Sequence, residues 1–582
     1  MKNYKKVYAA FILAGGLILH GCNGIFDDLA INPNQPSMGA YFTSPSAVND
    51  AVMTMYGYMS TQRCLGASGS KTTIIRSDEA SSNSDYGKPG MFGADLNASY
   101  YTIEQPYTLM YTTASQASYI IETAPSVDFS GNEELRNAYM GEAYFWRGFA
   151  HYYLLINFRN ISPIRQMPRN GDDYVRPLEK PAAVWNFIQE DLAHAKELLP
   201  VKGYWDSKNA GRVTKASAAA LLGKAYLYRS GIEQYYGEDK TTFYSEAAKE
   251  FGDVIDGKYG TYDLTKNYAD NFDVAHENNE ESILEFQFLG DVDNAGFNPG
   301  LATSGLAFDS RGLMLPGAGV GYEGVVHNWL YNAFVNSVDK DGYTDIRMFS
   351  TMIFNDLDAS IHLRNDAGGN PVRLEGPGGY KWEELYPAKN GKEGFATVSN
   401  PLAHSFKAGI RKGIDCSMPT QTEADGTPKL VGVGAGVKEY VYNQPRAHGV
   451  NWRYIRYADV LMMYAESVVS GGTPASNMTP LQAVNKVRGR ANMSELPSVT
   501  MADIQNERIL EFALEGHRFY DLLRWGKLAS RFTELQESDP NFKKFISADD
   551  FKGFVTNKHE WLPIPINEVN SNPYITENNP GY

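Results

Sequence analysis

Cys22 is the residue whose surroundings specify a chemical modification most clearly. Three lysines within the first six residues precede an apolar run, residues 7–19, which leads into Leu19-His20-Gly21-Cys22. A basic start, a short apolar run and a small residue before the cleavage point are typical of a secretory signal peptide. The run is too short to cross a bilayer, which takes about 20 apolar residues. We therefore expect cleavage before Cys22 and acylation of its thiol, as in bacterial lipoproteins. The alternative is an ordinary signal peptide with an incidental cysteine.

Catalytic chemistry has no comparable signal in this sequence. The chain contains no G-x-S-x-G nucleophile elbow, no G-x-x-x-x-G-K-[ST] phosphate loop and no H-E-x-x-H zinc motif. The paired carboxylates Asp78-Glu79 and Glu383-Glu384 could serve a glycosidase only if two carboxylates flanked a bond at about 5–9 Å. A partial calcium loop that begins at Asp291 has Ala295 and Ala302 where oxygen ligands are needed. We expect no catalytic residue, no metal ion and no cofactor.

Aromatic side chains in polar, glycine-rich stretches could bind sugars. Sugar rings expose C–H faces that stack on aromatic rings, and burying roughly 50 Å² at about 25 cal/mol/Å² gives about 1 kcal/mol per ring. Two or three rings with a few hydrogen bonds would give about 4–6 kcal/mol, which is roughly millimolar to tens of micromolar affinity. The candidate platforms are Tyr86, Phe92, Tyr100, Tyr322, Trp329 and Trp382. The alternative for each is a loop ring that packs into the core, as we expect for the helical tryptophans Trp146, Trp185 and Trp525.

The elements that would position these side chains are mostly helices. Apolar residues recur at helical spacing in several segments, and Ser44 is a suitable N-cap for the first. The expected helices cover about residues 45–60, 106–124, 139–158, 181–199, 217–230, 243–256, 453–467, 483–491 and 507–526. Within the last, we expect local i, i+3 ion pairs. These pairs are Arg508 with Glu511, Glu515 with Arg518, and Asp521 with Arg524.

Some of these helices match a known repeat. Tetratricopeptide pairs place Leu-Gly-x2-Tyr in the first helix and Ala-x3-Phe in the second. Leu222-Gly223 with Tyr226 supplies the first element, and Ala247 with Phe251 supplies the second. Met140-Gly141 with Tyr144, followed by Ala183 with Phe187, is a looser copy. In such pairs the glycine lets the helices approach while the larger residues interlock. Between about 260 and 450 helical periodicity largely disappears and Gly, Pro, Asn and Asp are dense, which indicates loops with short helices and strands.

Composition argues against nucleic acid as a partner, and it leaves the number of domains and the state of two cysteines open. The net charge of −15 argues against nucleic acid, because affinity for phosphates rests on Lys and Arg. The 582 residues are long for one core, so the chain could form one elaborated domain or two interleaved ones. Cys64 and Cys416 could pair in an oxidising exterior, although two unpaired buried thiols are the preferred interpretation.

The order of several segments resembles that of the SusD/RagB family of Bacteroidetes surface lipoproteins. The similar segments are spread from the N-terminal cysteine to the last residue, and the similarity is weakest at about 290–450. They are Glu507-Arg508 with Glu515–Trp525, Leu562–Pro565 with Asn578–Tyr582, Arg453–Ser467 with Val487–Ala491, Ala143–Phe145, and Asn32–Asn34. Each segment alone is a modest match, whereas the ordered set is specific.

The resemblance implies a mostly α fold: four tetratricopeptide-like helix pairs as a scaffold, with a loop-rich, irregular α/β half packed on it. It implies a glycan binder, not an enzyme, that delivers its ligand to a SusC-like TonB-dependent transporter in the outer membrane. Asp27-Asp28 resembles the acidic surface-export signal of that phylum. Family ligand sites also tend to draw on the two loop stretches that hold the aromatic candidates.

The expected organisation has five parts. They are a lipoprotein signal peptide (1–21), a lipidated tether (22–45), an N-terminal region with helix pairs (46–259), a loop-rich variable region (260–450) and a C-terminal region with the last helix pair and an irregular tail (451–582). Two alternative functions stay open. One is a surface glycosidase or esterase, and the other is a tetratricopeptide scaffold that binds a protein or peptide. Which glycan is bound cannot be deduced from the sequence.

Overall fold

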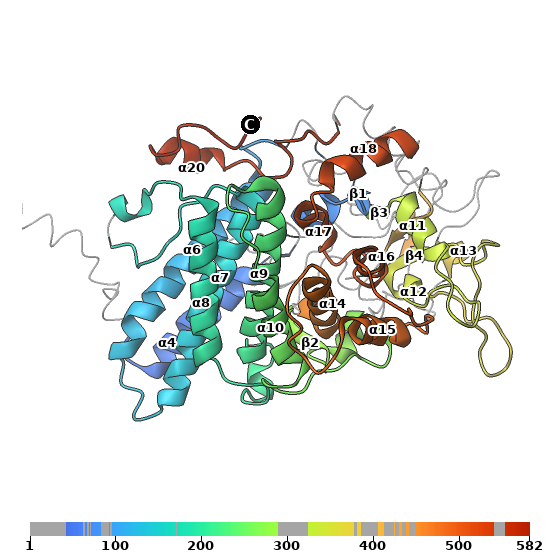
Figure 1. Cartoon of the computed structure of the whole chain (residues 1–582), viewed down its shortest axis with the longest axis horizontal. Coiled ribbons are helices and arrows are strands. Elements are labelled where there is room, and N and C mark those ends of the chain that lie inside the picture. The colour runs from blue at the N-terminus through green and yellow to red at the C-terminus, as the bar shows by residue number, and fades with distance from the viewer. Residues whose placement is uncertain are drawn as a thin grey trace, which may run out of the picture.

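The computed structural model has a helical half and a mixed half packed side by side (Figure 1). It describes residues 42–61, 64–66, 69, 71–82, 92, 96–169, 171–288, 324–376, 381–385, 406–412, 424, 430–432, 438–440, 450–539 and 553–582. Cys22, Cys416, the partial calcium loop at 291–302 and the acidic Asp27-Asp28 lie outside these residues. Among the described helices, none combines the length and hydrophobicity that crossing a membrane would require.

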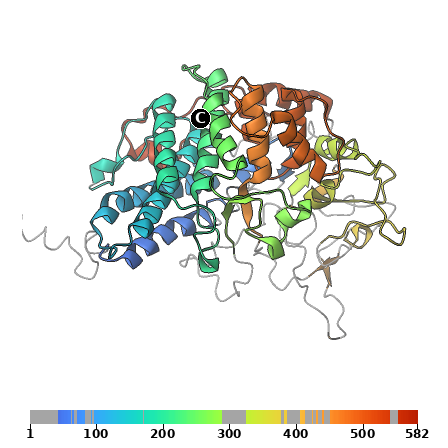
Figure 2. The ribbon, with the colours of Figure 1, turned by 60° about the horizontal axis from the view of Figure 1, so that its bottom comes forward.

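The helical half is a curved array in which each helix packs on the next along the chain (Figures 1 and 2). Its members are α4 (Pro45–Met59), α6 (Tyr101–Thr123), α7 (Glu133–Phe158), α8 (Pro181–Leu198), α9 (Lys215–Tyr236), α10 (Tyr244–Ile255), α14 (Tyr457–Val469) and α15 (Pro480–Arg490). The contacts form the pairs α4–α6, α7–α8, α9–α10 and α14–α15. The predicted four pairs are therefore confirmed. Ser44 caps α4 by accepting from the backbone N–H of Ala47, also as predicted.

The glycines of the repeat signature, Gly223 and Gly141, lie where the two helices of a pair touch. A Cβ placed on Gly223 would lie 2.8 Å from Cε1 of Phe251, so the two positions of the repeat signature touch across α9 and α10. In the looser copy, a Cβ on Gly141 would lie 2.9 Å from Leu199 instead of meeting Phe187. Both glycines therefore let the neighbouring segments pack closely, and any side chain at these positions would increase the distance between them.

The mixed half contains short strands and helices. A four-stranded antiparallel sheet has the order β1 (Ala80–Ser82), β3 (Gly324–Val326), β5 (Ala408–Ile410), β4 (Met352–Phe354). Strand β2 (Ser282–Phe286) pairs with β8 (Trp452–Arg456), and β6 (Leu430–Gly432) pairs with β7 (Lys438–Tyr440). The remaining α-helices are α11 (Asn328–Val335), α12 (Met348–Thr351), α13 (Trp382–Leu385), α16 (Met501–Glu511), α17 (Arg518–Arg524), α18 (Leu528–Ser538) and α20 (Ile566–Ser571). A π-helix spans Lys71–Ile75, and 3₁₀ turns span Ala124–Ser126, Gly171–Tyr174, Ser207–Asn209, Tyr268–Phe272 and Val274–His276.

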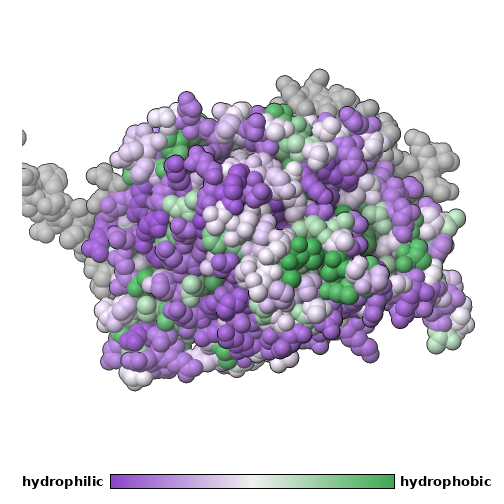
Figure 3. Space-filling view, viewed as in Figure 1, coloured by the Kyte–Doolittle hydropathy of each residue, from purple (hydrophilic) through white to green (hydrophobic). Residues whose placement is uncertain are grey.

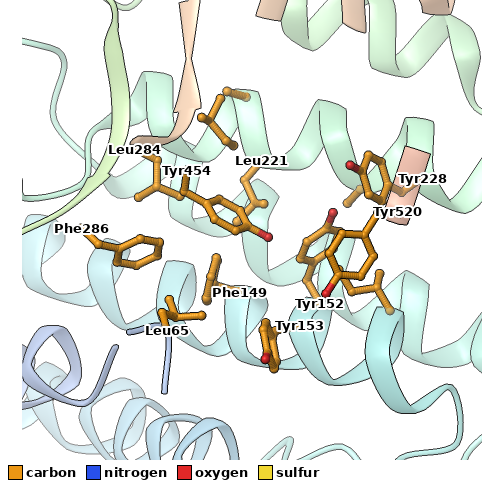
Figure 4. Close-up of a cluster of buried hydrophobic side chains, with 14 of the residues drawn as sticks. Leu65, Phe149, Tyr152, Tyr153, Leu221, Tyr228, Leu284, Phe286, Tyr454 and Tyr520 are labelled. Atoms are coloured by element: carbon orange, nitrogen blue, oxygen red, sulfur yellow. The ribbon is translucent and has the colours of Figure 1, made fainter. Parts of the chain in front are cut away.

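An aromatic core joins the two halves (Figure 4). Phe149 of α7 meets Phe286 of β2 at 5.7 Å and Tyr454 of β8 at 5.3 Å between ring centroids. Trp146 and Trp185 are completely buried, as predicted, and Trp525 is 8% exposed. Cys64 is a free, buried thiol whose pKa is raised by burial. The molecular face in Figure 3 is mostly hydrophilic, with a compact hydrophobic patch right of centre.

The prediction of one helix over 507–526 is wrong. Helix α16 ends at Glu511, and α17 starts at Arg518. Between them Leu514 and Gly516 have φ of 62° and 86°, which an α-helix cannot contain. The carbonyls exposed by the break have partners: Arg456 donates to the Glu511 carbonyl at 2.8 Å, and Lys412 donates to the Ala513 carbonyl at 2.8 Å. Tertiary hydrogen bonds therefore replace the helical ones.

The predicted local ion pairs are wrong for two of the three cases. Asp521 and Arg524 do pair, at 2.8 Å. Glu511 and Glu515 instead both contact Arg456, which also contacts Glu281 at 2.6 Å. Arg508 pairs with Asp521 and Asp459, and Arg518 pairs with Asp78. These side chains pair with residues of distant segments instead of their helix neighbours because they are buried. A buried charge needs an opposite charge or hydrogen-bonding partner beside it.

The α9–α10 contact gives the first testable prediction. Gly223→Ala should lower the free energy of unfolding by about 1–3 kcal/mol, because the added methyl overpacks the contact with Phe251. Gly57→Ala in α4 is the matched control, since a Cβ placed there would have no atom within 4 Å. That control should raise stability by about 0.5–1 kcal/mol through helix propensity alone. Urea denaturation of both variants measures the difference, and equal effects would contradict the interlocking contact.

Candidate functional site

The structure separates the six aromatic candidates into three groups. Tyr86 and Tyr322 lie outside the described residues. Phe92 and Trp382 are only 4% and 5% exposed. The ring of Phe92 stacks on His559 at 4.8 Å, and the rings of Phe532 and Phe554 meet it edge-on. The expectation of an open ring face is therefore wrong for Phe92 and Trp382, and for Phe92 distant segments supply the apolar surroundings that its own loop lacks.

Tyr100 stands at the start of α6. It is the N-cap residue of that helix, and its ring is half-buried. The neighbouring Tyr101 ring lies 5.2 Å away at an interplanar angle of 37° and is 38% exposed. The two rings therefore form an aromatic pair on the surface whose backbone is held by the helix. An exposed ring on a fixed backbone offers stacking area at low entropic cost.

Trp329 is the best-positioned of the candidates. It lies in the first turn of α11 and is half-buried. Its indole Nε1 donates a hydrogen bond to the backbone carbonyl of Asp78. The guanidinium groups of Arg531 and Arg518 lie 4.3 Å and 5.3 Å from the ring centroid. The hydrogen bond and the two cation–π contacts fix the ring before any ligand arrives.

The Asp78 carboxylate fixes those two arginines. Arg518 of α17 donates to it at 2.8 and 3.0 Å, and Arg531 of α18 donates at 2.7 Å. Burial would raise the pKa of Asp78, but these two guanidinium groups outweigh burial and hold it below its usual value. Asp78 is therefore ionised, and both of its carboxylate oxygens are bonded to arginines. The residue thus has a structural role, which is to hold the indole of Trp329 in place. In the sequence, Asp78 stands out only as half of a carboxylate pair.

A serine–histidine pair next to this anchor resembles hydrolase chemistry. His327 Nδ1 lies 2.7 Å from the Asp78 carbonyl, so it carries the proton, and Nε2 accepts from the Ser81 hydroxyl. Both side chains are buried, at 2% and 3% exposure, and burial lowers the pKa of His327. The pair joins β1 to the residue before α11 and has no open approach for a substrate. This contact therefore holds the Trp329 site together and does not favour the esterase alternative.

Glu79 is the second carboxylate of the pair. It is 1% exposed, and burial, followed by the charge of Asp78, raises its pKa to about 8. Its Oε1 accepts from the backbone N–H of Leu514 at 3.0 Å, inside the break between α16 and α17. Glu79 is thus a neutral acid near pH 7 that closes the helix break. A glycosidase would need both carboxyl groups to reach a glycosidic bond, and neither is exposed.

Metal binding has no support in the described part of the chain. No group of three or more His, Cys, Asp or Glu side chains there could hold an ion. The acidic turn around Asp339 illustrates why. Its carboxylate pairs with Arg364 and accepts from Asn492 at 3.1 Å, so protein groups already occupy the oxygens.

Two family models match this chain. Residues 422–582 match the model of the SusD family, and residues 31–227 match a family described as starch-binding and associating with the outer membrane. A SusD-like protein of Bacteroides ovatus is 24% identical over 533 residues, which covers 90% of this chain and 83% of that protein.

Solved structures share the same fold. The crystal structure of a SusD superfamily protein from Bacteroides vulgatus aligns with a TM-score of 0.67 at 22% identity, covering 93% of this chain and all of that one. A laminarin-binding SusD-like protein aligns with a TM-score of 0.63 at 22% identity, again over 93% of this chain and all of that one.

The Glu79 site generates a prediction about pH. Because its folded pKa of about 8 exceeds the reference value of 4.5, the folded state holds a proton that the unfolded state releases between these values. The Glu79 contribution to stability is therefore complete below pH 4.5 and declines as pH rises to about 8, by at most about 1.4 kcal/mol per pH unit. Glu79→Gln mimics the protonated acid and removes this decline.

Denaturation of both proteins across this pH range measures the effect. The stability of Glu79→Gln relative to the wild type should rise with pH, whereas Glu495→Gln, at an exposed position, should run parallel to the wild type. A constant difference for Glu79→Gln would show that Glu79 is ionised in the folded protein.

Proposed function

This chain belongs to the SusD family, and from that premise we propose that it is a cell-surface lipoprotein that captures oligo- or polysaccharide for a partner transporter. The observation that carries the proposal is the match of residues 31–227 to a starch-binding family that associates with the outer membrane. A structural neighbour that binds laminarin supports a glycan as the ligand.

The ligand site that we propose is centred on Trp329. Its side chain is half-buried and held by Asp78, Arg518 and Arg531, so stacking a sugar on its exposed part costs little reorganisation. Tyr100, with its partner Tyr101, is a second exposed platform, and Tyr86 and Tyr322 remain candidates from the sequence. Phe92 and Trp382 are not carried forward, because neither ring has an open face.

Binding without turnover is what these parts can perform. Stacked rings recognise the C–H faces of sugars, and amide or hydroxyl groups pair with their hydroxyls. Two or three stacked rings together with a few hydrogen bonds give about 4–6 kcal/mol, which is weak enough for rapid release. The chemically suggestive groups, Ser81 with His327 and Asp78 with Glu79, are buried and serve the fold. These observations support a binding protein over a glycosidase or esterase.

The anchor and the partner complete the proposal. Acylation of Cys22 would hold the protein on the outer membrane, with Asp27-Asp28 as its surface-export signal. A SusC-like TonB-dependent transporter is the proposed partner, because weak capture benefits a cell only when release occurs beside an import pore. A scaffold that binds peptide is the second candidate, and the tetratricopeptide-like helix array is the observation in its favour.

The Trp329 site predicts a selective loss of affinity. Trp329→Ala should weaken binding to the polysaccharide that the wild type retards in affinity gels by about 1–3 kcal/mol, because a large stacking face is lost. Trp205→Ala is a closely matched control. Trp205 is also half-buried, its Nε1 donates to the Val213 carbonyl at 3.2 Å, and Arg212 lies 4.1 Å from its ring.

Both variants should lose similar stability, but only Trp329→Ala should lose affinity. Gels with laminarin, xyloglucan, starch and other neutral polysaccharides measure binding, and thermal melting measures folding. If the two variants bind equally well, Trp329 is not part of the site. If the wild type binds no polysaccharide, the proposed function is wrong.

The anchor predicts where the protein resides. Cys22→Ala should move the protein from the detergent phase to the aqueous phase, because no acyl chain then holds it. Cross-linking of intact membranes should join the wild-type protein, but not this variant, to a TonB-dependent transporter, which mass spectrometry would identify. Unchanged detergent partitioning would argue against lipidation, and a wild-type protein that cross-links to no transporter would argue against the partner.

A further inference from the structure

A second pocket lies in the helical half, away from the residues assigned to the Trp329 site. It has a volume of about 430 Å³ and is lined by residues of α9, α14, α16 and α17, together with Tyr244 at the start of α10. Figure 1 shows these helices beside one another. The volume is within the range of about 300–1,000 Å³ typical of small-molecule sites.

The deepest part of this pocket carries charges that are already neutralised. Arg524 donates to Glu466 at 2.7 Å and to Asp521 at 2.8 Å, and the indole Nε1 of Trp525 donates to Glu466 at 2.8 Å. At the rim, the Lys527 ammonium donates to the Gln505 amide oxygen at 2.6 Å. Every buried charge has its partner within the protein, so the pocket does not select an anionic or cationic ligand.

The wall of the pocket presents an aromatic ring that is both exposed and fixed. Tyr235 is 56% exposed. Its ring nevertheless packs directly on Gly526, where any Cβ would overlap the ring. Gly526 also has a φ of 64°, which a residue with a side chain rarely adopts. The glycine therefore holds one part of the ring, while the exposed part remains open for stacking.

Polar groups around this ring are available to a ligand. Tyr235, Tyr244 and Ser470, each of which carries a hydroxyl, and Gln234, which carries a side-chain amide, line the pocket. None of these hydroxyl and amide groups makes a hydrogen bond to another described residue. By contrast, a smaller pocket near Trp205 has its polar groups bonded to one another, as with Asn209 to Asp206 at 2.8 Å and Arg212 to Glu142 at 2.8 Å.

We propose that the Tyr235 pocket is a second carbohydrate-binding site, which takes one or two neutral sugar rings. An open aromatic face, unused hydroxyl and amide groups and buried charges that are paired within the protein suit a neutral sugar, and the Lys527 ammonium at the rim can donate to sugar hydroxyls. A peptide ligand would bring a terminal ammonium, and Glu466, the carboxylate that lines the pocket, is already engaged by Arg524 and Trp525. The inference rests on the proposed function, and it adds a site on the helix array. A polysaccharide that engages both sites gains affinity through effective concentration, although each site is weak.

Ligand-observed saturation-transfer NMR on the full chain tests this pocket, with millimolar methyl glycosides of glucose, galactose, mannose and xylose as probes. Tyr235→Ala should lower the affinity of the responding probe at this site about fivefold, the loss of about one stacked ring. Ala502→Leu, which fills the pocket from the first turn of α16, should have a similar effect without removing any contact. The matched controls are Tyr574→Ala, a tyrosine 58% exposed outside the pocket, and Asn506→Leu, an exposed position on the same helix.

The outcomes separate the two sites. Partial loss of transfer in Tyr235→Ala and in Trp329→Ala, with complete loss in the double variant, supports both sites. Loss in the two pocket variants alone supports the pocket and removes Trp329. Transfer that depends on Trp329 and is unaffected by both pocket variants overturns this inference and leaves the proposed function intact; a peptide-binding pocket would give that result. If no probe receives saturation from the wild type, this inference is overturned, and the proposed function is judged separately by the retardation of the wild type in the polysaccharide gels.

Discussion

The burial of Arg456 among three carboxylates is the interaction on which the rest of this structure depends. Arg456 ends strand β8, and its partners come from three other places: Glu281 before β2, Glu511 at the end of α16 and Glu515 beyond it. All four side chains are at most 5% exposed. Burial would raise the pKa of Glu511, but Arg490, Arg456 and Arg347 hold it below its usual value. The cluster also includes Asp345, Glu507, Lys412 and Arg488, so that its carboxylates and cations are matched in number. Removing one member would leave a buried charge without its partner, which is among the costliest changes in a protein interior.

This cluster lies at the helix break that leads to the candidate site. Glu511 and Glu515 both bind Arg456, and the backbone between them leaves the helical conformation at Leu514, whose φ is 62°, so that α17 starts afresh at Arg518. Arg518 then reaches Asp78, and the Asp78 carbonyl accepts from the Trp329 indole. A chain of contacts thus runs from a buried charge cluster to the half-buried indole of Trp329. The position of the Trp329 ring is well defined because each group behind it is held by an ionic or hydrogen-bonded partner. A preorganised site requires this arrangement.

The helix array has a different role, because its stability comes from close apolar packing. Gly223 against Phe251 and Gly141 against Leu199 set the spacing of neighbouring helices. The C-terminal pair α14–α15 continues the array, and α17 packs on α9. The charged residues of α17 therefore contact both the array and the mixed half. A rigid frame of this kind suits capture of a ligand by surface rings, since little conformational entropy is lost when the ligand binds.

The sequence by itself determined the helix pairs, the repeat contact and the family. These features depend on residues that are close in the sequence or lie in adjacent helices, so they can be recognised from the sequence pattern. They include the helical periodicity, the Ser44 cap and the Gly223–Phe251 signature. The tertiary structure alone decided which aromatic rings are exposed and which charges pair. Phe92 lies in a polar loop, yet it is buried by Phe532, Phe554 and His559, which are more than 400 residues away. Tyr235 lies in a helix, yet it is 56% exposed, and the covered part of its ring packs on Gly526 of a distant segment. Burial and ion pairing depend on which distant segments meet, and no local spacing encodes that.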